Sequence, residues 1–136
     1  MHKILFYNEL IIYSTIEGLD ECMDIVKKIS ERFNFSFDKC FALQTVLVEA
    51  LENAFIHGNK GVRELKVRVL IKISKSEIFL EVEDCGDGYD ISTVTSTIDG
   101  SNFHKESGRG IFFIKRLSSS YCTVGKGNII RIKLER

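Results

Sequence analysis

The chain has 136 residues, of which 44% are hydrophobic and 28% charged, a composition that predicts one globular domain over residues 1–136. Its 19 Lys and Arg balance its 19 Asp and Glu, which argues against direct nucleic-acid binding, because contacts to the phosphate backbone need clustered positive charge. Four scattered cysteines without Cys-x-x-Cys spacing, and the lack of a signal peptide or an apolar run of membrane-spanning length, predict a cytoplasmic protein that does not engage a membrane.

The N-terminal region predicts two short strands and an amphipathic helix. Apolar runs at residues 3–7 and 10–13, separated by Asn8 and Glu9, indicate the two strands. Residues 19–33 then place apolar side chains at helical spacing, which predicts a helix with one face toward a core.

A second helix is expected to begin at Asp38 as its N-cap and to end near His57, with Gly58 as its stop. It is apolar nearly all round, which is typical of a buried helix. One polar stripe at four-residue spacing interrupts this pattern, formed by Thr45, Glu49, Asn53 and His57. The stripe either faces water or lines a ligand cleft, because a carboxylate on a buried helix is costly without partners.

Two strands and a long loop follow the second helix. Residues 65–73 and 78–83 alternate apolar and polar side chains, which indicates half-buried strands joined by a hairpin turn at Lys75 and Ser76. Residues 89–107 show no clear period and are rich in Ser, Thr, Asp and Gly, which predicts a loop.

The C-terminal region predicts a short helix and a last hairpin. Residues 110–117 indicate the helix, and residues 121–124 and 129–134 indicate two strands joined by a tight turn at residues 125–127, Gly-Lys-Gly. Helices grouped against a mixed, mainly antiparallel sheet make a two-layer α/β sandwich, an α+β fold.

Two glycine-bearing strings carry further chemistry. Residues 84–88, Asp-Cys-Gly-Asp-Gly, follow a strand, and Gly86 and Gly88 would let the backbone approach a ligand closely. Residues 107–110, Ser-Gly-Arg-Gly, open a helix whose N–H groups and positive dipole end suit phosphate. Each string by itself also fits an ordinary turn or helix start. Walker A and Rossmann motifs are absent from the sequence.

Taken in order, these motifs resemble the N box and the two glycine boxes of the GHKL ATPases, the superfamily of gyrase and the histidine kinases. The three boxes correspond to Glu49-x-x-x-Asn53-Ala54-x-x-His57-Gly58-Asn59, to Asp84-x-Gly86-x-Gly88 and to Gly108-x-Gly110. Within this superfamily the chain most resembles the anti-sigma-factor serine kinases, whose E-A-x-x-N-A-x-x-H-G core corresponds to residues 49–58. The resemblance covers nearly the whole chain.

The resemblance implies a role for each matched residue. Asn53 would bind Mg²⁺ through its amide oxygen, and Glu49 would act as general base toward the attacking hydroxyl. Asp84 would accept a hydrogen bond from the adenine amino group of ATP, and residues 89–106 would form the ATP lid. The other residues expected to contact the nucleotide are His57, Gly86, Gly88, Lys105, Ser107, Gly108, Arg109 and Gly110.

The chain departs from the pattern of the serine kinases at four places. Residues 89–90 are Tyr-Asp rather than Ile-Pro or a similar pair, and a Thr-Thr-Lys-Pro-like lid segment is absent. Glu106 stands where an arginine often precedes the serine of the second glycine box, so Lys105 or Arg109 would supply the charge near the γ-phosphate. Asn128 follows the last Gly, where the family commonly has a threonine whose hydroxyl supports the adenine pocket.

The resemblance implies an ATP-dependent serine/threonine kinase that acts as an anti-sigma factor, phosphorylates an anti-anti-sigma-type protein and forms a homodimer. One alternative is a nucleotide-gated protein-binding module with little or no catalysis. Another, the catalytic fragment of a sensor histidine kinase, is disfavoured because the sequence starts with strands where a phospho-accepting helix pair is expected. The apolar N-terminal residues fit either a dimer face or the core, and they are Ile4, Leu5, Phe6, Ile11 and Ile12.

Overall fold

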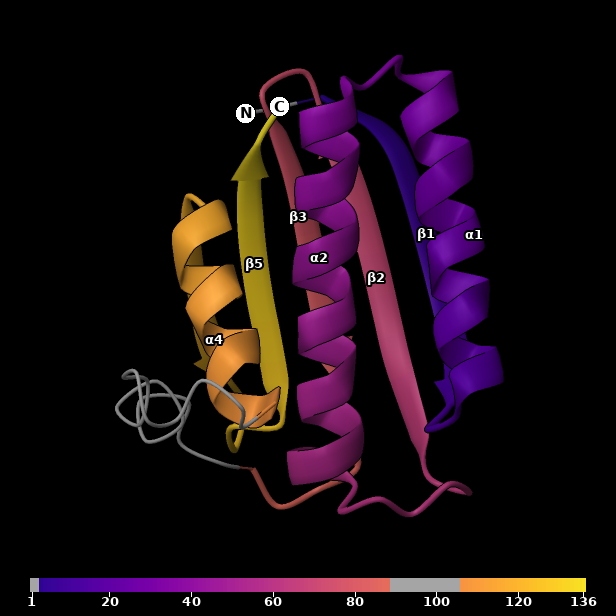
Figure 1. Ribbon diagram of the computed structural model, residues 1–136, viewed down its shortest axis with the longest axis vertical. Helices are drawn as coiled ribbons and strands as arrows, with labels where there is room; N and C mark the ends of the chain where they lie inside the picture. The colour runs from indigo at the N-terminus through magenta and orange to yellow at the C-terminus, as the bar shows by residue number, and fades with distance from the viewer. Residues whose placement is uncertain (1–2, 89–105) are drawn as a thin grey trace.

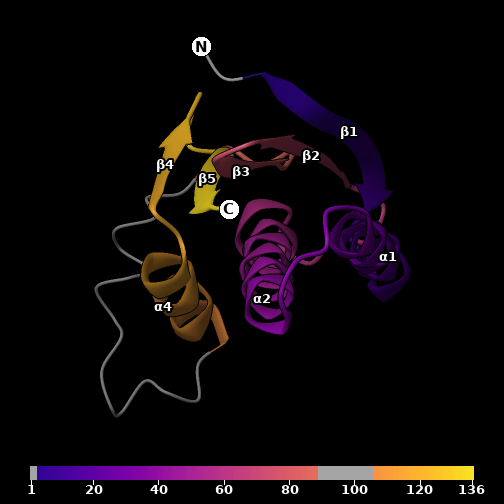
Figure 2. The ribbon, with the colours of Figure 1, turned by 90° about the horizontal axis from the view of Figure 1, so that it is seen from above.

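A computed structural model describes residues 3–88 and 106–136 of the chain. They form a five-stranded sheet in the order β1-β2-β3-β5-β4, in which each neighbouring pair is antiparallel. The strands are β1 (Ile4–Tyr13), β2 (Lys66–Ser74), β3 (Glu77–Glu83), β4 (Ser120–Val124) and β5 (Ile129–Glu135), and the helices are α1 (Ile16–Arg32), α2 (Phe37–Asn53), the π-helix η1 (Ala54–Gly58) and α4 (Glu106–Leu117). The long helices α1, α2 and α4 lie side by side on one face of the sheet (Figures 1 and 2). This arrangement confirms the expected two-layer sandwich.

β1 is a single strand, so the prediction of two strands divided at Asn8 and Glu9 is wrong. Asn8 pairs with Ile71 and Glu9 with Leu70 of β2, and the antiparallel ladder runs through both positions. The carboxylate of Glu9 lies on the outer face of the sheet, 3.7 Å from Arg68. Because one face of an antiparallel sheet tolerates polar side chains, these residues do not end the strand.

Both long N-terminal helices start at hydroxyl N-caps that the sequence pattern did not indicate. The Thr15 side chain accepts a hydrogen bond from the Gly18 N–H (3.1 Å) and starts α1 earlier than expected. The Ser36 side chain accepts one from the Lys39 N–H (3.1 Å) and starts α2. Asp38, the predicted N-cap, lies instead in the first turn of α2, where a negative charge favours the positive end of the helix dipole.

α2 continues past Asn53 as a turn of π-helix, η1, which ends at Gly58 as expected. A π turn holds more residues than an α turn, so the four-residue spacing of the polar stripe stops at Asn53 and His57 is shifted around the helix axis. Single π turns are frequent at functional sites. The stripe is thereby reduced to its α-helical part, which includes Glu49 and Asn53.

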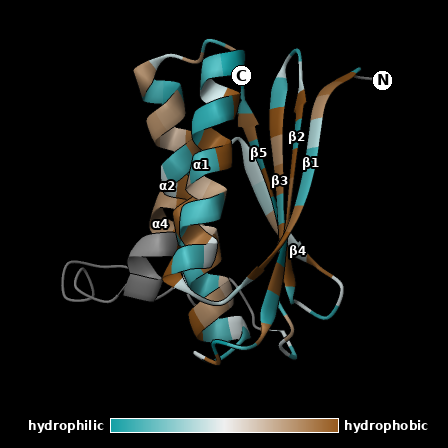
Figure 3. Cartoon of the chain, turned by 90° about the vertical axis from the view of Figure 1, so that its right-hand side faces the viewer, coloured by the Kyte–Doolittle hydropathy of each residue, from teal (hydrophilic) through white to brown (hydrophobic). Residues whose placement is uncertain are grey.

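The core lies between the sheet and the helical layer, the two layers seen edge-on in Figure 3, and it is built from buried side chains of both. The alternation of apolar and polar residues in the sequence correctly predicted which face of β2 and β3 is buried in this core. The fully buried side chains include Ile29, Leu43, Leu47, Leu51, Ile71, Ile73, Ile78, Leu80, Ile111, Ile114, Ile132 and Leu134. Burial of such side chains contributes about 1.5–3 kcal/mol each, so this interface fixes the helix ends relative to the sheet.

The C-terminal hairpin is confirmed, and α4 is longer than expected. β4 pairs with β5, and Gly125 and Gly127 in the turn adopt left-handed φ angles of 66° and 91°. Such angles suit glycine because it has no Cβ. α4 begins at Glu106, so residues 107–110 lie inside its first turns. Residues 89–105, most of the expected lid, lie outside the described part of the chain.

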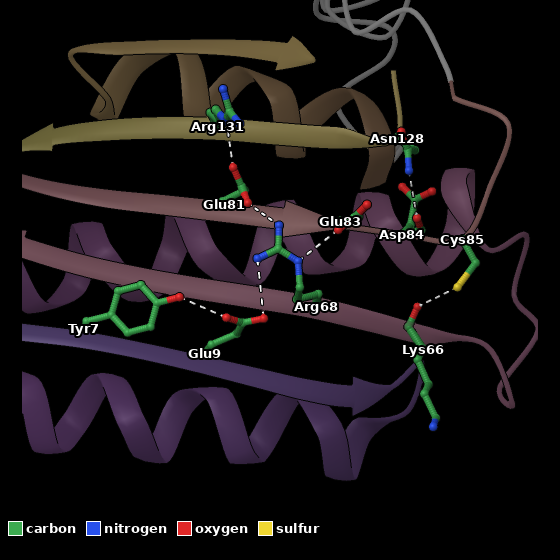
Figure 4. A network of polar contacts seen from close by, with 10 residues as sticks. All are labelled: Tyr7, Glu9, Lys66, Arg68, Glu81, Glu83, Asp84, Cys85, Asn128 and Arg131. Atoms are coloured by element: carbon green, nitrogen blue, oxygen red, sulfur yellow. Dashed lines mark hydrogen bonds and ion pairs between the residues drawn. The ribbon is translucent and has the colours of Figure 1, made fainter. Parts of the chain in front are cut away.

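The face of the sheet away from the helices carries a network of charged side chains (Figure 4). Glu81, only 7% exposed, accepts hydrogen bonds from Arg68 and from Arg131 Nε (2.6 Å). Arg68 also donates to Glu83 (2.9 Å) and lies 3.7 Å from Glu9. Burial acts to raise the pKa of Glu81, but the hydrogen bonds from Arg131 and Arg68 outweigh it and hold this pKa below its ordinary value.

Glu81→Gln is expected to lower the free energy of unfolding by about 1–2 kcal/mol at neutral pH, because it removes the charge that two arginines share. Since the folded-state pKa of Glu81 lies below the unfolded value, this contribution is present above the ordinary pKa and is lost as pH falls through the folded pKa. Urea unfolding should therefore show a difference at neutral pH that shrinks in acid. Glu77→Gln, on the same strand, is the control, and a pH-independent difference for Glu81→Gln would contradict the prediction.

Candidate functional site

The segments that carry the three motifs meet at one end of the molecule, the lower end in Figure 1. There α2 passes into η1, and the loop of residues 84–88 leaves the end of β3. This loop contacts η1 on one side and the turn between β4 and β5 on the other. α4 packs beside α2 and begins at the same end. The order of motifs in the sequence therefore corresponds to one region of the fold.

Gly58, at the end of η1, packs directly against Asp84. A Cβ built on Gly58 would lie 2.1 Å from both Cγ and Oδ2 of Asp84, closer than side-chain atoms approach one another. The Asp84 carboxylate thus occupies the space that the missing side chain of Gly58 leaves. Gly58, expected as the stop of the helix and as part of the N box, also admits this carboxylate to the helix end.

Gly86 and Gly88 make equally close contacts with the protein backbone. A Cβ on Gly86 would lie 2.2 Å from the carbonyl oxygen of Gly58. A Cβ on Gly88, whose φ is +95°, would lie 1.7 Å from the carbonyl oxygen of Lys126. The absence of these Cβ atoms lets the loop fit between η1 and the hairpin turn. Their contact with a nucleotide stays a prediction.

Asn53 is buried, 1% exposed, and its amide nitrogen has no hydrogen-bond partner among the described residues. An unpartnered buried polar group costs about 1–3 kcal/mol, so an acceptor atom placed against this nitrogen would stabilise the site. A carboxamide offers both an oxygen and two N–H donors. Asn53 can therefore present an oxygen to a metal ion or a donor to a phosphate, and it fits a Mg-nucleotide.

Asp84 carries a carboxylate in a poorly hydrated position, with 5% of the residue exposed. Burial raises the pKa of this carboxyl above its ordinary value. The N–H of Gly86, 2.8 Å from Oδ1, opposes the shift, as does the charge of Lys126, while Glu83 adds to it. Because few water molecules compete there, the carboxylate is well suited to accept a hydrogen bond from a neutral donor such as an amino group.

Two asparagines hold the backbone of the loop, and neither contact was expected. Asn59 Oδ1 accepts a hydrogen bond from the Cys85 N–H (2.8 Å), and Asn128 Nδ2 donates one to the Asp84 carbonyl (3.1 Å). In the sequence, Asn59 was only part of the N box and Asn128 only a departure from the family pattern. No local sequence signal marks these contacts, because they join segments that lie far apart in the chain.

Glu49 and His57 are both half-buried, Glu49 on α2 and His57 on η1. Glu49 precedes Asn53 by one α-helical turn, so the two lie on the same side of the helix as predicted. His57 is not aligned with them because it lies within the π turn. The roles of all three in binding or catalysis stay predictions.

For the second glycine box, the structure describes the helical backbone of residues 107–110 at the start of α4. The first N–H groups of an α-helix have no partner within that helix, and the dipole makes this end positive. The start of α4 therefore offers donors for an anion at the same end of the molecule as the loop of residues 84–88. Lys105 lies outside the described residues.

The described residues contain neither a cluster of metal-ligating side chains nor a membrane-spanning helix. Within residues 3–88 and 106–136, no three His, Cys, Asp or Glu side chains gather as metal ligands, and no helix is long and apolar enough to cross a membrane. The four cysteines are free thiols. A Mg²⁺ ion at Asn53 would rely on amide, phosphate and water oxygens, because Mg²⁺ prefers oxygen ligands and keeps several waters when it binds substrate phosphates.

Comparison with known proteins identifies the family. The sequence pattern of the histidine kinase-like ATPase domain matches residues 12–134. The chain belongs to this family. The match confirms the resemblance to GHKL ATPases drawn from the three boxes, and it includes the N box, the first and second glycine boxes and both strands of the last hairpin.

A solved structure shares the overall fold of this chain. The chain is similar to a chain in the crystal structure of the SiaB–SiaC complex from Pseudomonas aeruginosa, with a TM-score of 0.65 and 13% sequence identity. The match covers 99% of this chain and 90% of that chain. At this identity the likeness shows the fold alone. No curated protein matches the chain in sequence.

Proposed function

We propose that this protein is an ATP-dependent serine/threonine kinase that acts as an anti-sigma factor and phosphorylates an anti-anti-sigma-type partner. Membership of the histidine kinase-like ATPase family supports the ATP-dependent part. The observation that carries the proposal is the end of α2, where buried Asn53, whose amide nitrogen has no partner among the described residues, lies one turn from Glu49. The helix then ends at Gly58, which packs on Asp84. The end of α2 would thus bring a metal ligand and a base close to Asp84, the proposed acceptor for adenine.

Nucleotide binding would be divided among three segments. Asp84 would accept a hydrogen bond from the adenine amino group, and Asn53 would give its amide oxygen to Mg²⁺, which would neutralise charge on the phosphates. The start of α4 presents N–H groups to the phosphates. The further contacts in this proposal are His57, Gly86, Gly88, Lys105, Ser107, Gly108, Arg109 and Gly110.

Glu49 would act as general base toward a Ser or Thr hydroxyl of the partner. Its carboxylate takes the hydroxyl proton as the oxygen forms a bond to the γ-phosphorus, and the bond to the leaving ADP oxygen breaks. Transfer of this kind depends mainly on positioning and on charge stabilisation. A base and a metal ligand one turn apart on a rigid helix meet that requirement.

A protein partner is supported by the structural comparison. The similar chain comes from a complex of two proteins, SiaB and SiaC. The proposed partner of the present chain is the acceptor of the phosphate, with a sigma factor as a second partner, a homodimer as the assembly and the cytoplasm as the location. A pull-down from the native cell with and without ATP identifies these partners and shows whether nucleotide controls them.

The proposal requires that the protein binds Mg-ATP through Asp84. Asp84→Asn should weaken ATP binding about tenfold or more, because a charged acceptor becomes a neutral group that also donates. Calorimetry with ATP and ADP in the presence of Mg²⁺ measures the affinity. Asp87→Asn is the matched control, the same change at an exposed position of the same loop. A wild-type protein that binds neither nucleotide would refute the proposed function.

The second candidate is a nucleotide-gated protein-binding module that uses the same nucleotide site with little or no catalysis. Glu49 has an interaction within the protein, as a purely structural carboxylate on a buried helix would also have. The departures in the lid segment point the same way. This candidate keeps the roles of Asn53 and Asp84 and removes only that of Glu49.

A further inference from the structure

Asn59 is buried, 1% exposed, and its side chain joins three separate segments. Its Nδ2 donates to Ser14 Oγ (2.9 Å) at the end of β1 and to the Lys66 carbonyl (3.2 Å) at the start of β2. Its Oδ1 accepts from the Cys85 N–H (2.8 Å) in the loop of residues 84–88. Both ends of this carboxamide, its nitrogen and its oxygen, therefore tie the loop to the ends of β1 and β2.

Asn128 holds the same loop from the opposite side. The Asp84 N–H donates to the Asn128 carbonyl (3.0 Å), and Asn128 Nδ2 donates to the Asp84 carbonyl (3.1 Å). Figure 4 shows Asn128, Asp84 and Cys85 together where β3 ends. With the bond from the Gly86 N–H to Asp84 Oδ1 (2.8 Å), three consecutive N–H groups of the loop each have a defined acceptor. The backbone that carries the Asp84 carboxylate is fixed on both sides.

We propose that Asn59 and Asn128 are positioning residues that hold Asp84 in its nucleotide-accepting geometry before a nucleotide arrives, and so set the preference of the site for a 6-amino purine. The inference rests on the proposed nucleotide site. A hydrogen bond from one amino group depends steeply on direction, and an acceptor on a loop keeps its direction only if the backbone is fixed. Because the loop is already ordered, nucleotide binding does not lose free energy in ordering it.

The residue type at both positions fits this role. Asn59 faces a hydroxyl and a carbonyl on one side and an N–H on the other, so it needs a donor and an acceptor in one side chain. Aspartate would lack the donors, and serine would be too short to span the segments. At position 128, the amide supplies a donor that reaches the Asp84 carbonyl. The departure from threonine noted in the sequence thus gives the loop an additional bond.

The test compares ATP with purine riboside triphosphate, which lacks only the 6-amino group. The wild type should prefer ATP by about tenfold or more, the value of one hydrogen bond to a charged acceptor. Asn59→Ala and Asn128→Ala should each reduce this preference for ATP toward the weaker preference expected of Asp84→Asn. In the Asp84→Asn background, neither should change the preference further, because both act through Asp84. A residue that only stabilised the fold would lower the affinity for both nucleotides equally.

Ser14→Ala is the matched control, because it removes one partner of Asn59 and leaves the bond from Cys85 to Oδ1 in place. It should lower stability and keep the preference for ATP. In the protein without nucleotide, the Cys85 amide should exchange slowly with solvent in the wild type and in Ser14→Ala, and faster in Asn59→Ala. Asn128 is only half-buried, so Asn128→Ala decides the question if Asn59→Ala does not fold.

Two results would overturn the inference and can be told apart from failure of the proposed function. Folded asparagine variants that keep the full preference for ATP would show that Asp84 needs no positioning, even though the nucleotide site exists. A further loss of preference in the Asp84→Asn background would show that the asparagines act by another route. Absence of ATP binding by the wild type would instead refute the proposed function itself.

Discussion

Glu49→Gln is expected to lower phosphate transfer to the partner protein by about 10²–10⁴-fold while ATP affinity stays nearly unchanged. Glutamine keeps the size and hydrogen-bonding shape of the side chain but cannot take up the hydroxyl proton. The change leaves Asn53, one turn later on α2, in place as the expected metal ligand. Transfer of labelled phosphate from ATP to the purified partner gives the rate, and calorimetry gives the affinity.

Glu52→Gln is the matched control, because Glu52 is also a half-buried carboxylate of α2 but is not part of the polar stripe. It should transfer phosphate at the wild-type rate. Equal transfer by the wild type and Glu49→Gln would exclude the base role. No transfer by either would favour the nucleotide-gated binding module. Asn53→Ala differs from both, since it should lose Mg-dependent ATP binding and, with it, the transfer.

Alternation and helical spacing were sufficient to predict the layers of the fold. The apolar face of β2, which includes Val67 and Ile71, is buried as the period-two pattern requires, because burial sums the preference of many residues. Helix starts were less predictable. Ser36 and Asp38 are both good N-caps, and only the backbone conformation at Ser36 decides between them. Whether Asn8 and Glu9 interrupt β1 was similarly ambiguous from the sequence, because their pairing with β2 is not a local property.

The order of the motifs predicted which segments meet in the candidate site, but not how they are held there. Gly58 and Asp84 were both named from the sequence, whereas their direct contact, made where α2 ends in a π turn, was not. The bonds of Asn59 and Asn128 to the loop join residues separated by 26 and 44 positions in the chain. Contacts of such long range depend on tertiary structure, so no periodic pattern records them.

Gly58→Ala is expected to weaken ATP binding about a hundredfold or more, a larger effect than removing the charge of Asp84 alone. The new Cβ would lie 2.1 Å from Asp84 Cγ, so the carboxylate must turn away from the helix end. That movement also breaks the bond between Asp84 Oδ1 and the Gly86 N–H. Asp84 then cannot accept from adenine, and the displaced helix end moves Asn53 away from its expected ligand.

Gly61→Ala is the matched control for Gly58→Ala. A Cβ on Gly61 would meet no atom within 4 Å, and its cost is the strain of a left-handed φ of +75°, about 1–2 kcal/mol. Both variants should therefore unfold at lower urea concentration than the wild type, while only Gly58→Ala loses ATP binding in calorimetry on the folded protein. Wild-type ATP affinity in folded Gly58→Ala would mean that the packing of Asp84 on the helix end plays no part in nucleotide binding.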